Sequence, residues 1–448
     1  MYDSVIVGGG LTGLCIGIKL RQLGEDVVIL EKADHVGGHA SSIKIGQYWM
    51  DFGPHIFRLT SERLKNYYNS FLKADFRIIK SNPKIYKYGT YFDHVIPCIT
   101  RKNIEILSKL KGFNHTFEFV SGKSGGENFE EYLISSVGKD LYWEFFGEYS
   151  QKWWGVPPSL LDVCLAPKNI YIGDVQEYSH YTIDQSSISN VVEVYPRVGG
   201  FQSLANQLNF NAEKSGVLIV THCNVSRVDC NINSMEVAAQ IDDKEITFKT
   251  RKVYLTCPID VVAKILNIKK PNLDYRGILF GFIHFQGETS FEKYSWTYLH
   301  ETRFLAGRVY DARYYCEPVA SKNDEWTAIC IEIPMNIDYD HYTQNNATHN
   351  LEILEHECLR AFEQLVDESL VKITRWPSAD MRVKTHYHRY SYPLLIKGYQ
   401  KVYLSFQEEV SSLSEKIKLE GRNARFEYLN SNNIIDRYLL SNWPYGDK

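Results

Sequence analysis

The first thirty residues predict an α/β fold that opens with a Rossmann-like βαβ unit. The apolar run from Ser4 to Val7 is typical of a buried parallel strand, and residues 14–23 carry apolar side chains at helical spacing. A second apolar run, Val27 to Leu30, follows that helix. Between the first strand and the helix lies the pattern G-x-G-x-x-G at residues 8–13. Strand, glycine loop, helix and strand in this order predict a dinucleotide-binding domain.

The glycine loop has a physical role for each of its fixed positions. Gly8 makes the tight turn, Gly10 lets the backbone approach a pyrophosphate, and Gly13 allows helix and strand to pack closely. The helix N-terminus offers unpaired N–H groups and a positive dipole end to the phosphates. Glu31 ends the second strand, eighteen residues after Gly13, where a carboxylate accepts hydrogen bonds from a ribose diol. The strand, the glycine loop, the helix, the second strand and the acidic residue therefore all occur at the spacing that a dinucleotide-binding unit requires.

Composition and length restrict the class of protein. The chain has 448 residues, 44% hydrophobic and 23% charged, and its net charge of −4 gives no basic field to attract nucleic acid. The length predicts two or three domains. Nine scattered cysteines without a C-x-x-C pair predict reduced thiols rather than disulfides or a zinc site. No stretch of about 18 apolar residues occurs. We therefore expect a cytoplasmic protein without an integral membrane segment or a nucleic-acid partner.

The segment after Glu31 distinguishes between possible dinucleotides. Residues 32–42, KADHVGGHASS, place a Gly-Gly pair and small hydroxyl residues after the acidic residue. This extension resembles the second FAD fingerprint of the flavin amine oxidase superfamily, whereas a plain dehydrogenase would usually continue into a helix. The resemblance implies FAD as the cofactor, with the Gly-Gly pair close to the flavin phosphate and ribityl chain.

Three further segments resemble the UDP-galactopyranose mutase family. Residues 51–57, DFGPHIF, are similar to its GPHIFHT loop, which implies that His55 lies against the flavin ring. Residues 149–155, YSQKWWG, resemble its YTxKQWG segment, with Trp154 on the tryptophan that lines the substrate site. Residues 253–260, VYLTCPID, resemble VYTGPID. A structural turn histidine and an ordinary core tryptophan are the alternative interpretations of the two residues.

The closing segment carries the same resemblance. Residues 421–435, GRNARFEYLNSNNII, are similar to GRLAEYKYYDMDQVI, in which the arginine contacts FAD and the tyrosine six residues later holds the nucleotide diphosphate. These roles are implied for Arg422 and Tyr428. Residues 307–311, GRVYD, more loosely match TRIxE and imply that Arg308 also binds diphosphate, with a surface ion pair as the alternative. Tyr392, in the segment YSYP, is expected at the substrate.

The resemblances together define a set of site residues. They imply catalytic roles for His55 and Arg308 and substrate binding by Trp154, Arg308, Tyr392 and Tyr428. They imply cofactor binding by Gly8, Gly10, Thr12, Gly13, Glu31, Lys32, Gly38, His39, Ala40, Ser41, His55, Gly421 and Arg422. No metal site is expected: His386 and His388 would share one strand face, but no third ligand stands at ligand spacing.

Two activities remain open. In the mutase family the N5 of reduced flavin attacks the anomeric carbon of a nucleotide-activated sugar and isomerises pyranose to furanose without net redox change. Residues 194–201, VYPRVGGF, look more like the protoporphyrinogen oxidase and amine oxidase branch, and the mutase segment YFNDTYQGIPKNGY is not recognisable. An oxidoreductase would instead transfer hydride from substrate to N5, and a flavin-binding protein without chemistry is a third interpretation. The sugar, the nucleotide, the electron acceptor and a homodimer are not decided by the sequence.

The chain path expected from the resemblance is discontinuous. Residues 1–75, 190–275 and 395–448 are expected to form the FAD-binding domain, and residues 76–189 and 276–394 an inserted α+β substrate-binding domain. Within the latter, residues 76–190 look mostly helical, with helices over 103–111 and 129–146. Residues 278–285 and 326–333 look like strands, and 349–366 like a helix. Residues 236–241 and 245–249 predict a hairpin in the FAD-binding domain.

Overall fold

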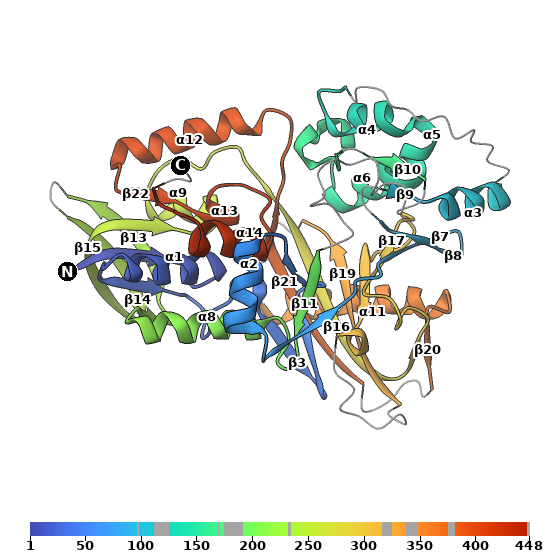
Figure 1. Cartoon of the computed structure of the whole chain (residues 1–448), viewed down its shortest axis with the longest axis horizontal. Helices are drawn as coiled ribbons and strands as arrows, with labels where there is room; N and C mark the ends of the chain where they lie inside the picture. Colours follow the sequence, from blue (N-terminus) through green and yellow to red (C-terminus); the bar gives the residue numbers. More distant parts are fainter. Residues whose placement is uncertain are drawn as a thin grey trace.

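A computed structural model describes residues 1–95, 98–111, 125–168, 170–173, 191–231, 234–315, 325–336, 347–374 and 381–445. Within these ranges two large sheets stand side by side (Figure 1). The sheet with the N-terminal strand and its helices lies on the left of this view, the second sheet with helix α11 lies at lower right, and helices α3 to α6 lie at upper right.

The first sheet has seven strands among the described residues, in the order β12-β2-β1-β15-β14-β13 with β22 beside β15. Its strands are β1 (Tyr2–Val7), β2 (Val27–Leu30), β12 (Leu218–Val220), β13 (Asn224–Cys230), β14 (Met235–Ile241), β15 (Lys244–Leu255) and β22 (Ile417–Leu419). β1, β2, β12, β22 and the end of β15 pair in parallel, as the sequence predicts for a Rossmann-like unit. β14 and β15 form the predicted hairpin.

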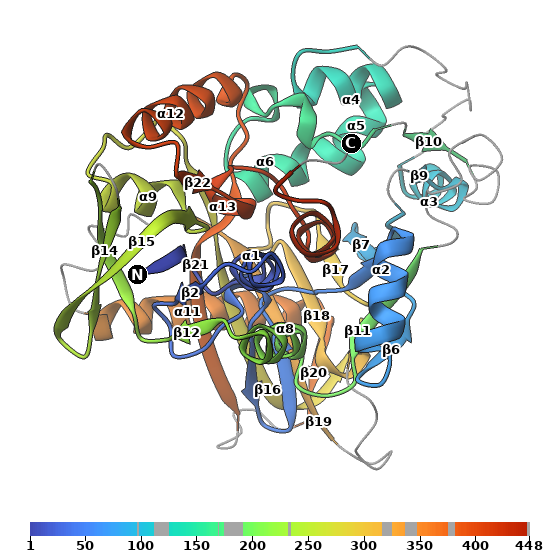
Figure 2. The same cartoon turned by 60° about the vertical axis from the view of Figure 1, so that its left-hand side comes forward.

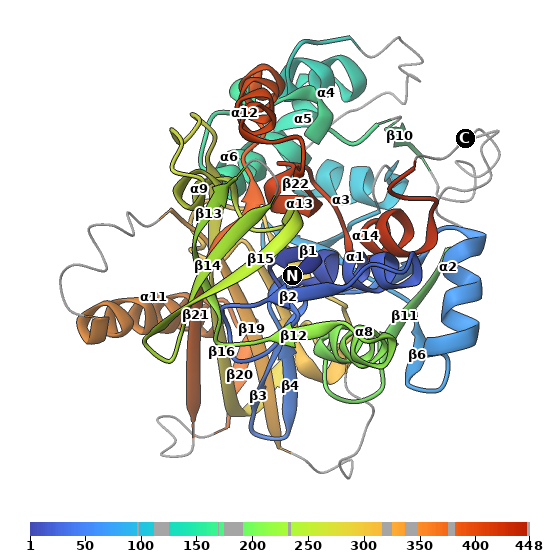
Figure 3. The ribbon, with the colours of Figure 1, turned by 90° about the vertical axis from the view of Figure 1, so that its left-hand side faces the viewer.

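Parallel strands of this sheet are buried on both faces, which explains their continuous apolar runs. Ile6 and Ile29 pack on the side of α1 (Leu11–Gln22) and α8 (Gln202–Ser215). Val5, Val7 and Val28 pack on the side of α9 (Ile259–Ile265) and α12 (Tyr399–Leu413). Figure 2 shows α1 above α8 beside β2 and β12. Figure 3 shows α9 and α12 on the upper side of these strands and α8 on the lower side.

The second sheet has eight strands among the described residues, in the order β20-β16-β19-β18-β17-β7-β8 with β21 beside β16. Its strands are β7 (Lys84–Lys87), β8 (Thr90–Asp93), β16 (Tyr275–Thr289), β17 (Thr297–Leu299), β18 (Arg308–Asp311), β19 (Trp326–Pro334), β20 (Val371–Ile373) and β21 (Arg382–Pro393). Helix α11 (Ala347–Asp367) covers it through buried Cys358, Phe362 and Leu365. The strands predicted at 278–285 and 326–333 and the helix predicted at 349–366 are confirmed.

Smaller elements join the two sheets. The small sheets are β5 (Phe57–Leu59)-β11 (Val192–Pro196)-β6 (Phe76–Ile79), β3 (Ser42–Ile45)-β4 (Tyr48–Asp51) and β9 (Cys98–Ile99)-β10 (Tyr171–Ile172). The remaining helices are α2 (Glu62–Tyr67), α3 (Arg101–Lys111), α4 (Phe129–Val137), α5 (Lys139–Tyr142), α6 (Glu148–Trp154), α13 (Gly421–Ala424) and α14 (Ser431–Ile435). Short 3₁₀ and π segments are η1 (Gly38–Ala40), η2 (Tyr68–Leu72), η3 (Trp143–Gly147), η4 (Pro158–Leu160), η5 (Val163–Leu165), η6 (Ala312–Tyr314) and η7 (Asp436–Leu440).

The segment 76–190 contains four short strands, β6 to β9, that the sequence analysis does not predict. β7 pairs with β17 and β6 with β11, far along the chain, and β8 pairs with β7. One expectation about this segment is wrong. The helix expected over 129–146 is interrupted at Gly138, whose φ of +79° ends α4 before α5 begins. Among the described residues, no helix is both long and apolar enough to cross a bilayer.

A buried carboxylate joins the segments on either side of the His55 loop. Asp51, at the end of β4, is 3% exposed. Its carboxylate accepts hydrogen bonds from Ser42 Oγ at 2.6 Å, Tyr195 OH at 2.7 Å and the Phe201 backbone N–H at 2.8 Å. Its backbone carbonyl accepts one from Tyr310 OH at 2.7 Å. Asp51 therefore links β4 to β3, β11, the start of α8 and, through β18, the second sheet.

Asp51 gives the folded protein a pH-dependent stability. Burial raises the pKa of Asp51 to about 6, although the three donors oppose this shift. The folded pKa lies above the unfolded one, so stability is full at low pH and is lost as pH rises through 6. Between pH 4 and 7 the free energy of unfolding of the wild type should therefore fall by about 2 kcal/mol more than that of Asp51→Asn. Urea denaturation at several pH values measures this difference. Asp140→Asn, an exposed change on α5, should follow the wild type, and parallel pH profiles for wild type and Asp51→Asn would contradict the prediction.

Candidate dinucleotide and substrate site

A large cavity of about 2140 Å³ lies where the two sheets meet. The first sheet contributes the β1–α1 loop and the end of β2, and the second sheet contributes the ends of β17, β18 and β21. A smaller chamber of about 220 Å³ shares Arg308, Tyr392 and Tyr428 with it and is lined by aromatic residues of η3 and α6. Since ordinary ligand pockets measure about 300–1,000 Å³, the larger cavity has room for a cofactor and a substrate together.

The glycine loop has the close approaches that its sequence predicts. Gly8 has a φ of +107°, and a Cβ on Gly13 would lie 2.0 Å from the Gly8 carbonyl oxygen. A Cβ on Gly10 would meet nothing nearer than the Gly37 carbonyl at 4.0 Å, so Gly10 leaves the cavity wall bare. Gly10 also caps α1 without a side-chain hydrogen bond. The first turn of α1 thus offers its backbone N–H groups to a ligand.

Glu31 stands at the end of β2 on the cavity wall, 9% exposed. Its Oε2 accepts a hydrogen bond from the Gly9 N–H at 2.6 Å, and its Oε1 accepts one from the Ala33 N–H at 2.9 Å. The two bonds fix the carboxylate in place beside the glycine loop. Each oxygen has a second lone pair, so the group can still accept from a ribose hydroxyl.

The His55 loop places its imidazole on the cavity wall. The ring stacks on Phe201 with a centroid distance of 5.0 Å and an interplanar angle of 21°. Its Nδ1 is buried and has no hydrogen-bond partner. Withdrawal from water, and then the charges of Arg308 and His39, lower the pKa of His55 to about 3. A neutral imidazole with a free ring nitrogen therefore faces the cavity at neutral pH.

Arg308, at the start of β18, forms a buried ion pair. Its Nε and Nη2 donate to the two oxygens of Glu332 at 2.6 and 2.7 Å, and Glu332 is fully buried on β19. Burial alone would lower the pKa of Arg308, but the Glu332 carboxylate raises it well above its usual value. The guanidinium also lies 5.3 Å from the Trp153 ring and 5.7 Å from the Tyr298 ring. Arg308 thus forms a buried ion pair rather than a surface one. Nη1 is the guanidinium nitrogen that makes no hydrogen bond with Glu332.

Arg422, in α13, is held in a different way. Its guanidinium carbon lies 4.8 Å from the ring centroids of both Tyr392 and Tyr428. Those two rings stack on each other 5.7 Å apart at 9°, so the guanidinium lies beside the stacked pair rather than between the rings. Nη2 donates to the Ser391 carbonyl at 2.7 Å, and Nε is buried without a hydrogen-bond partner. Trp154 contacts the edge of Tyr392 at 5.9 Å and lines the smaller chamber. Three of the predicted substrate residues therefore meet Arg422 at one end of the cavity.

The structure brings most of the predicted residues to these two cavities. Gly13 and Gly421 lie just behind the wall, and a Cβ on Gly421 would come within 2.6 Å of Thr12 Oγ1, so α13 packs against the first turn of α1. The wall of the larger cavity includes the predicted residues Gly8, Gly10, Thr12, Glu31, Lys32, Gly38, His39, Ala40, Ser41, His55, Arg308, Tyr392, Arg422 and Tyr428. Their individual roles stay predictions.

Histidines gather on the same wall. His388 lies 5.3 Å from His39 and 4.5 Å from His386 between ring centroids, and Phe52 stacks on it at 4.6 Å. Burial lowers the pKa of His39 to about 3 and that of His388 well below its usual value. Within the described part of the chain, no three His, Cys, Asp or Glu side chains are arranged to hold a metal ion.

Sequence reasoning did not identify Glu332 or Phe201 as parts of the site. Glu332 was visible as the single charged residue in the apolar run WTAICIEIP, a position that a buried ion pair explains. Phe201 follows the Gly199-Gly200 pair but carried no signal of its own. Its contact with His55 depends on the Asp51 hydrogen bonds described above, which join segments 150 residues apart.

Comparisons with known proteins agree with this geometry. A model of the NAD(P)-binding Rossmann-like domain matches residues 6–71. A probable UDP-galactopyranose mutase of Klebsiella pneumoniae is 29% identical over 36% of this chain and 42% of its own length. A probable flavin-containing monoamine oxidase A of Dictyostelium discoideum is 35% identical over 27% of this chain and 25% of its own length. The matched segments thus span less than half of either relative.

Two solved structures share the fold over nearly the whole chain. Reduced UDP-galactopyranose mutase aligns with a TM-score of 0.72 at 14% identity and covers 98% of this chain and 92% of its own. A putative protoporphyrinogen oxidase of Exiguobacterium aligns with a TM-score of 0.65 at 13% identity, covering 98% and 97%. The predicted fold class is confirmed, and the homologues are FAD-dependent, as the sequence predicts for this chain. The chain is therefore similar in sequence to a UDP-galactopyranose mutase and to a flavin-containing monoamine oxidase, and it shares the fold of the two solved structures.

Proposed function

We propose that this protein is an FAD-dependent enzyme that isomerises the ring of a nucleotide-activated sugar, as UDP-galactopyranose mutases do by name. The observation that carries the proposal is the guanidinium of Arg422 beside the stacked rings of Tyr392 and Tyr428, with Arg308 at the same end of the cavity. A diphosphate is the substrate group that two such guanidinium groups suit.

FAD fits the residues of the larger cavity. The bare wall at Gly10 and the open first turn of α1 would hold its pyrophosphate, and Glu31 would hold its ribose. The Nδ1 of His55 is buried and has no hydrogen-bond partner, so this part of the cavity wall suits a polar group of the ligand. When bound, FAD would supply a flavin N5 that acts as nucleophile or hydride acceptor. The protein's own part is to bind, orient and exclude water.

The charge of the cavity supports an anionic substrate over a cationic amine. The wall carries more basic than acidic side chains although the whole chain is acidic. The basic ones are Lys32, Arg58, Lys80, Lys84, Lys264, Arg308, Arg389 and Arg422, and the acidic ones Glu31, Asp93 and Glu193. Glu31 already accepts a hydrogen bond from the Gly9 N–H, and Glu193 accepts one from Arg58. An amine that carries a positive charge would meet repulsion here, whereas a diphosphate would be attracted.

An oxidoreductase is the second candidate. Its support is the oxidase-like segment 194–201, whose Phe201 supports His55, together with the amine oxidase relative. Hydride transfer to the flavin needs positioning and a dry site rather than a dedicated acid or base. The neutral His55 is compatible with both candidates.

One experiment distinguishes the two candidates. The purified holoprotein is incubated with UDP-sugars, with and without dithionite, while the flavin spectrum and the sugar ring form are followed. The mutase predicts isomerised sugar under reduction and no bleaching of oxidised flavin by substrate alone. Bleaching by substrate alone, with an oxidised product, would reject the mutase and support the oxidoreductase.

The glycine loop gives a test of cofactor binding. Gly13→Ala would place a Cβ 2.0 Å from the Gly8 carbonyl, so α1 must move away from β1 and its first turn must leave the pyrophosphate position. We expect the ratio of FAD to protein after purification to fall several-fold. Gly17→Ala, one turn later in α1, meets only the flexible end of Ile29 at 2.9 Å and should keep its FAD. Equal FAD content in both variants would count against this cofactor site.

Arg422 gives a test of substrate binding. Lysine lacks the planar, five-donor guanidinium that packs beside Tyr392 and Tyr428, so Arg422→Lys should weaken UDP binding about 10- to 100-fold, measured by calorimetry. Arg425→Lys is the control, because Arg425 pairs with Glu427 away from the cavity wall. If Arg422→Lys lost FAD but bound UDP normally, Arg422 would be a cofactor residue alone.

A further inference from the structure

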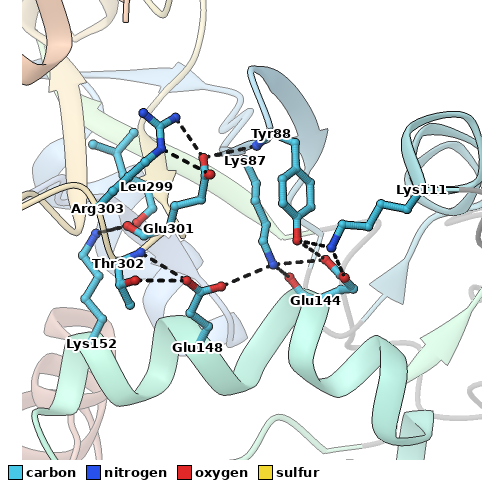
Figure 4. Close-up of polar contacts among 10 residues, drawn as sticks. All are labelled: Lys87, Tyr88, Lys111, Glu144, Glu148, Lys152, Leu299, Glu301, Thr302 and Arg303. Carbon is cyan, nitrogen blue, oxygen red and sulfur yellow. Dashed lines mark hydrogen bonds and ion pairs between the residues drawn. The ribbon is translucent and has the colours of Figure 1, made fainter. Parts of the chain in front are cut away.

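Lys152, in the middle of the segment YSQKWWG, makes contacts that neither candidate function accounts for. Its Nζ donates to three backbone carbonyls. Two are those of Leu299 at 2.9 Å and Glu301 at 3.0 Å (Figure 4), and the third is that of Ala306 at 2.6 Å. All three belong to one turn, residues 299–307, which connects β17 to β18. An ammonium group has three N–H donors, so the turn uses every one of them.

The two segments that Lys152 joins both lead to the substrate end of the cavity. The turn runs directly into Arg308, whose guanidinium binds Glu332 and lies over Trp153. Trp153 and Trp154 follow Lys152 on α6, and Trp154 touches Tyr392. A change at Lys152 therefore reaches Arg308 from both sides, through the turn and through the indole of Trp153.

We propose that Lys152 is a positioning residue whose ammonium ties the 299–307 turn to α6 and thereby fixes the Arg308 guanidinium. This inference depends on the proposed function only for the identity of the ligand that Arg308 binds. The tie itself is a property of the chain and can be measured without substrate.

The carboxylates that face Lys152 are engaged by other donors. Glu148, one turn earlier on α6, lies 3.6 Å from Lys87 and accepts from the Thr302 N–H at 3.2 Å. Glu301, in the turn, lies 3.1 Å from Arg303. No carboxylate of the described chain forms a salt bridge with Lys152, whose ammonium is held by carbonyl dipoles.

The other charged groups around the tie form a network that reaches the turn through Lys87 and Tyr88. Glu144 binds Lys87 at 3.1 Å and Lys111 at 2.9 Å and accepts from Tyr88 OH at 2.9 Å (Figure 4). His300, in the turn itself, is neutral because burial lowers its pKa well below its usual value. Lys111 binds Tyr88 and Glu144 and makes no hydrogen bond to the turn, so it offers a control.

The ammonium of Lys152 is weakly stabilised. Withdrawal from water lowers the pKa of Lys152 to about 7, and Glu148 and Glu301 raise it by less. As pH rises through 7 the amine retains two N–H groups for three carbonyls, so the tie loses a bond. Because the folded pKa lies below the unfolded one, this deprotonation removes a cost of burying charge. The loosening is therefore local, and global stability does not fall with it.

Hydrogen–deuterium exchange of the 299–311 segment tests the tie directly. After correction for the intrinsic pH dependence of exchange, wild-type protection should fall about fivefold between pH 6 and 8.5, as expected for one lost hydrogen bond. Lys152→Arg cannot deprotonate and should stay protected at both pH values. Lys152→Met should be unprotected at both. Lys111→Met should follow the wild type. Wild-type protection independent of pH, or a wild-type pH profile in Lys152→Met, would overturn the proposal.

UDP binding separates this inference from the proposed function. Wild-type affinity for UDP, measured by calorimetry, should fall about fivefold over the same pH range, while Lys152→Arg keeps its affinity. If exchange switches as described but UDP does not bind at any pH, the proposed function fails and the tie stands. If UDP binds and its affinity changes equally with pH in wild type and Lys152→Arg, Lys152 does not position Arg308.

Discussion

The buried carboxylate of Asp51 is the interaction on which the rest of the site depends. Three donors from separate segments converge on it, and its own carbonyl accepts a fourth bond from the second sheet. A charge buried at this depth is tolerated only when its lone pairs are satisfied, so the four segments cannot move independently. The His55 loop begins one residue later, and its ring rests on Phe201, one of the residues that Asp51 fixes. The geometry of the cavity wall is thus set by a polar contact outside it.

How much of this could be predicted depends on whether the signal is local. The βαβ unit, the 235–255 hairpin and helix α11 follow from periodicity and glycine positions within thirty residues, and the sequence predicts them correctly. The strands β6 to β9 could not be found in this way, because each has four residues or fewer and β6 and β7 depend on the distant partners β11 and β17. Most of the predicted site residues line the larger cavity, but the pairing of Arg308 with Glu332 depends on neighbouring strands and was not visible in either segment alone.

Three cations in and near the cavity are held in physically distinct ways. Arg308 binds a carboxylate through two nitrogens, Arg422 packs beside two stacked aromatic rings and donates to a carbonyl, and Lys152, behind the cavity wall, is bound by carbonyls alone. A buried ion pair is neutral and attracts an anion less, whereas aromatic faces and carbonyl dipoles leave the full charge available. Arg422 therefore keeps more of its charge available to an anion than Arg308 does. This difference follows from the neighbours of each residue rather than from its type.

The contact of Gly421 with Thr12 has a consequence for how the protein is made. The glycine loop is synthesised first, but α13, which packs on it and carries Arg422, lies more than four hundred residues later. Since chains emerge from the ribosome N-terminus first, the opening βαβ unit must wait for the end of the chain before its ligand site is complete. During the first part of that interval the apolar strand β1 lacks its neighbour β15, and β2 lacks its neighbour β12. Binding of a ligand at the complete site therefore follows the synthesis of α13, and the unpaired strands of the nascent chain are the part most exposed to aggregation.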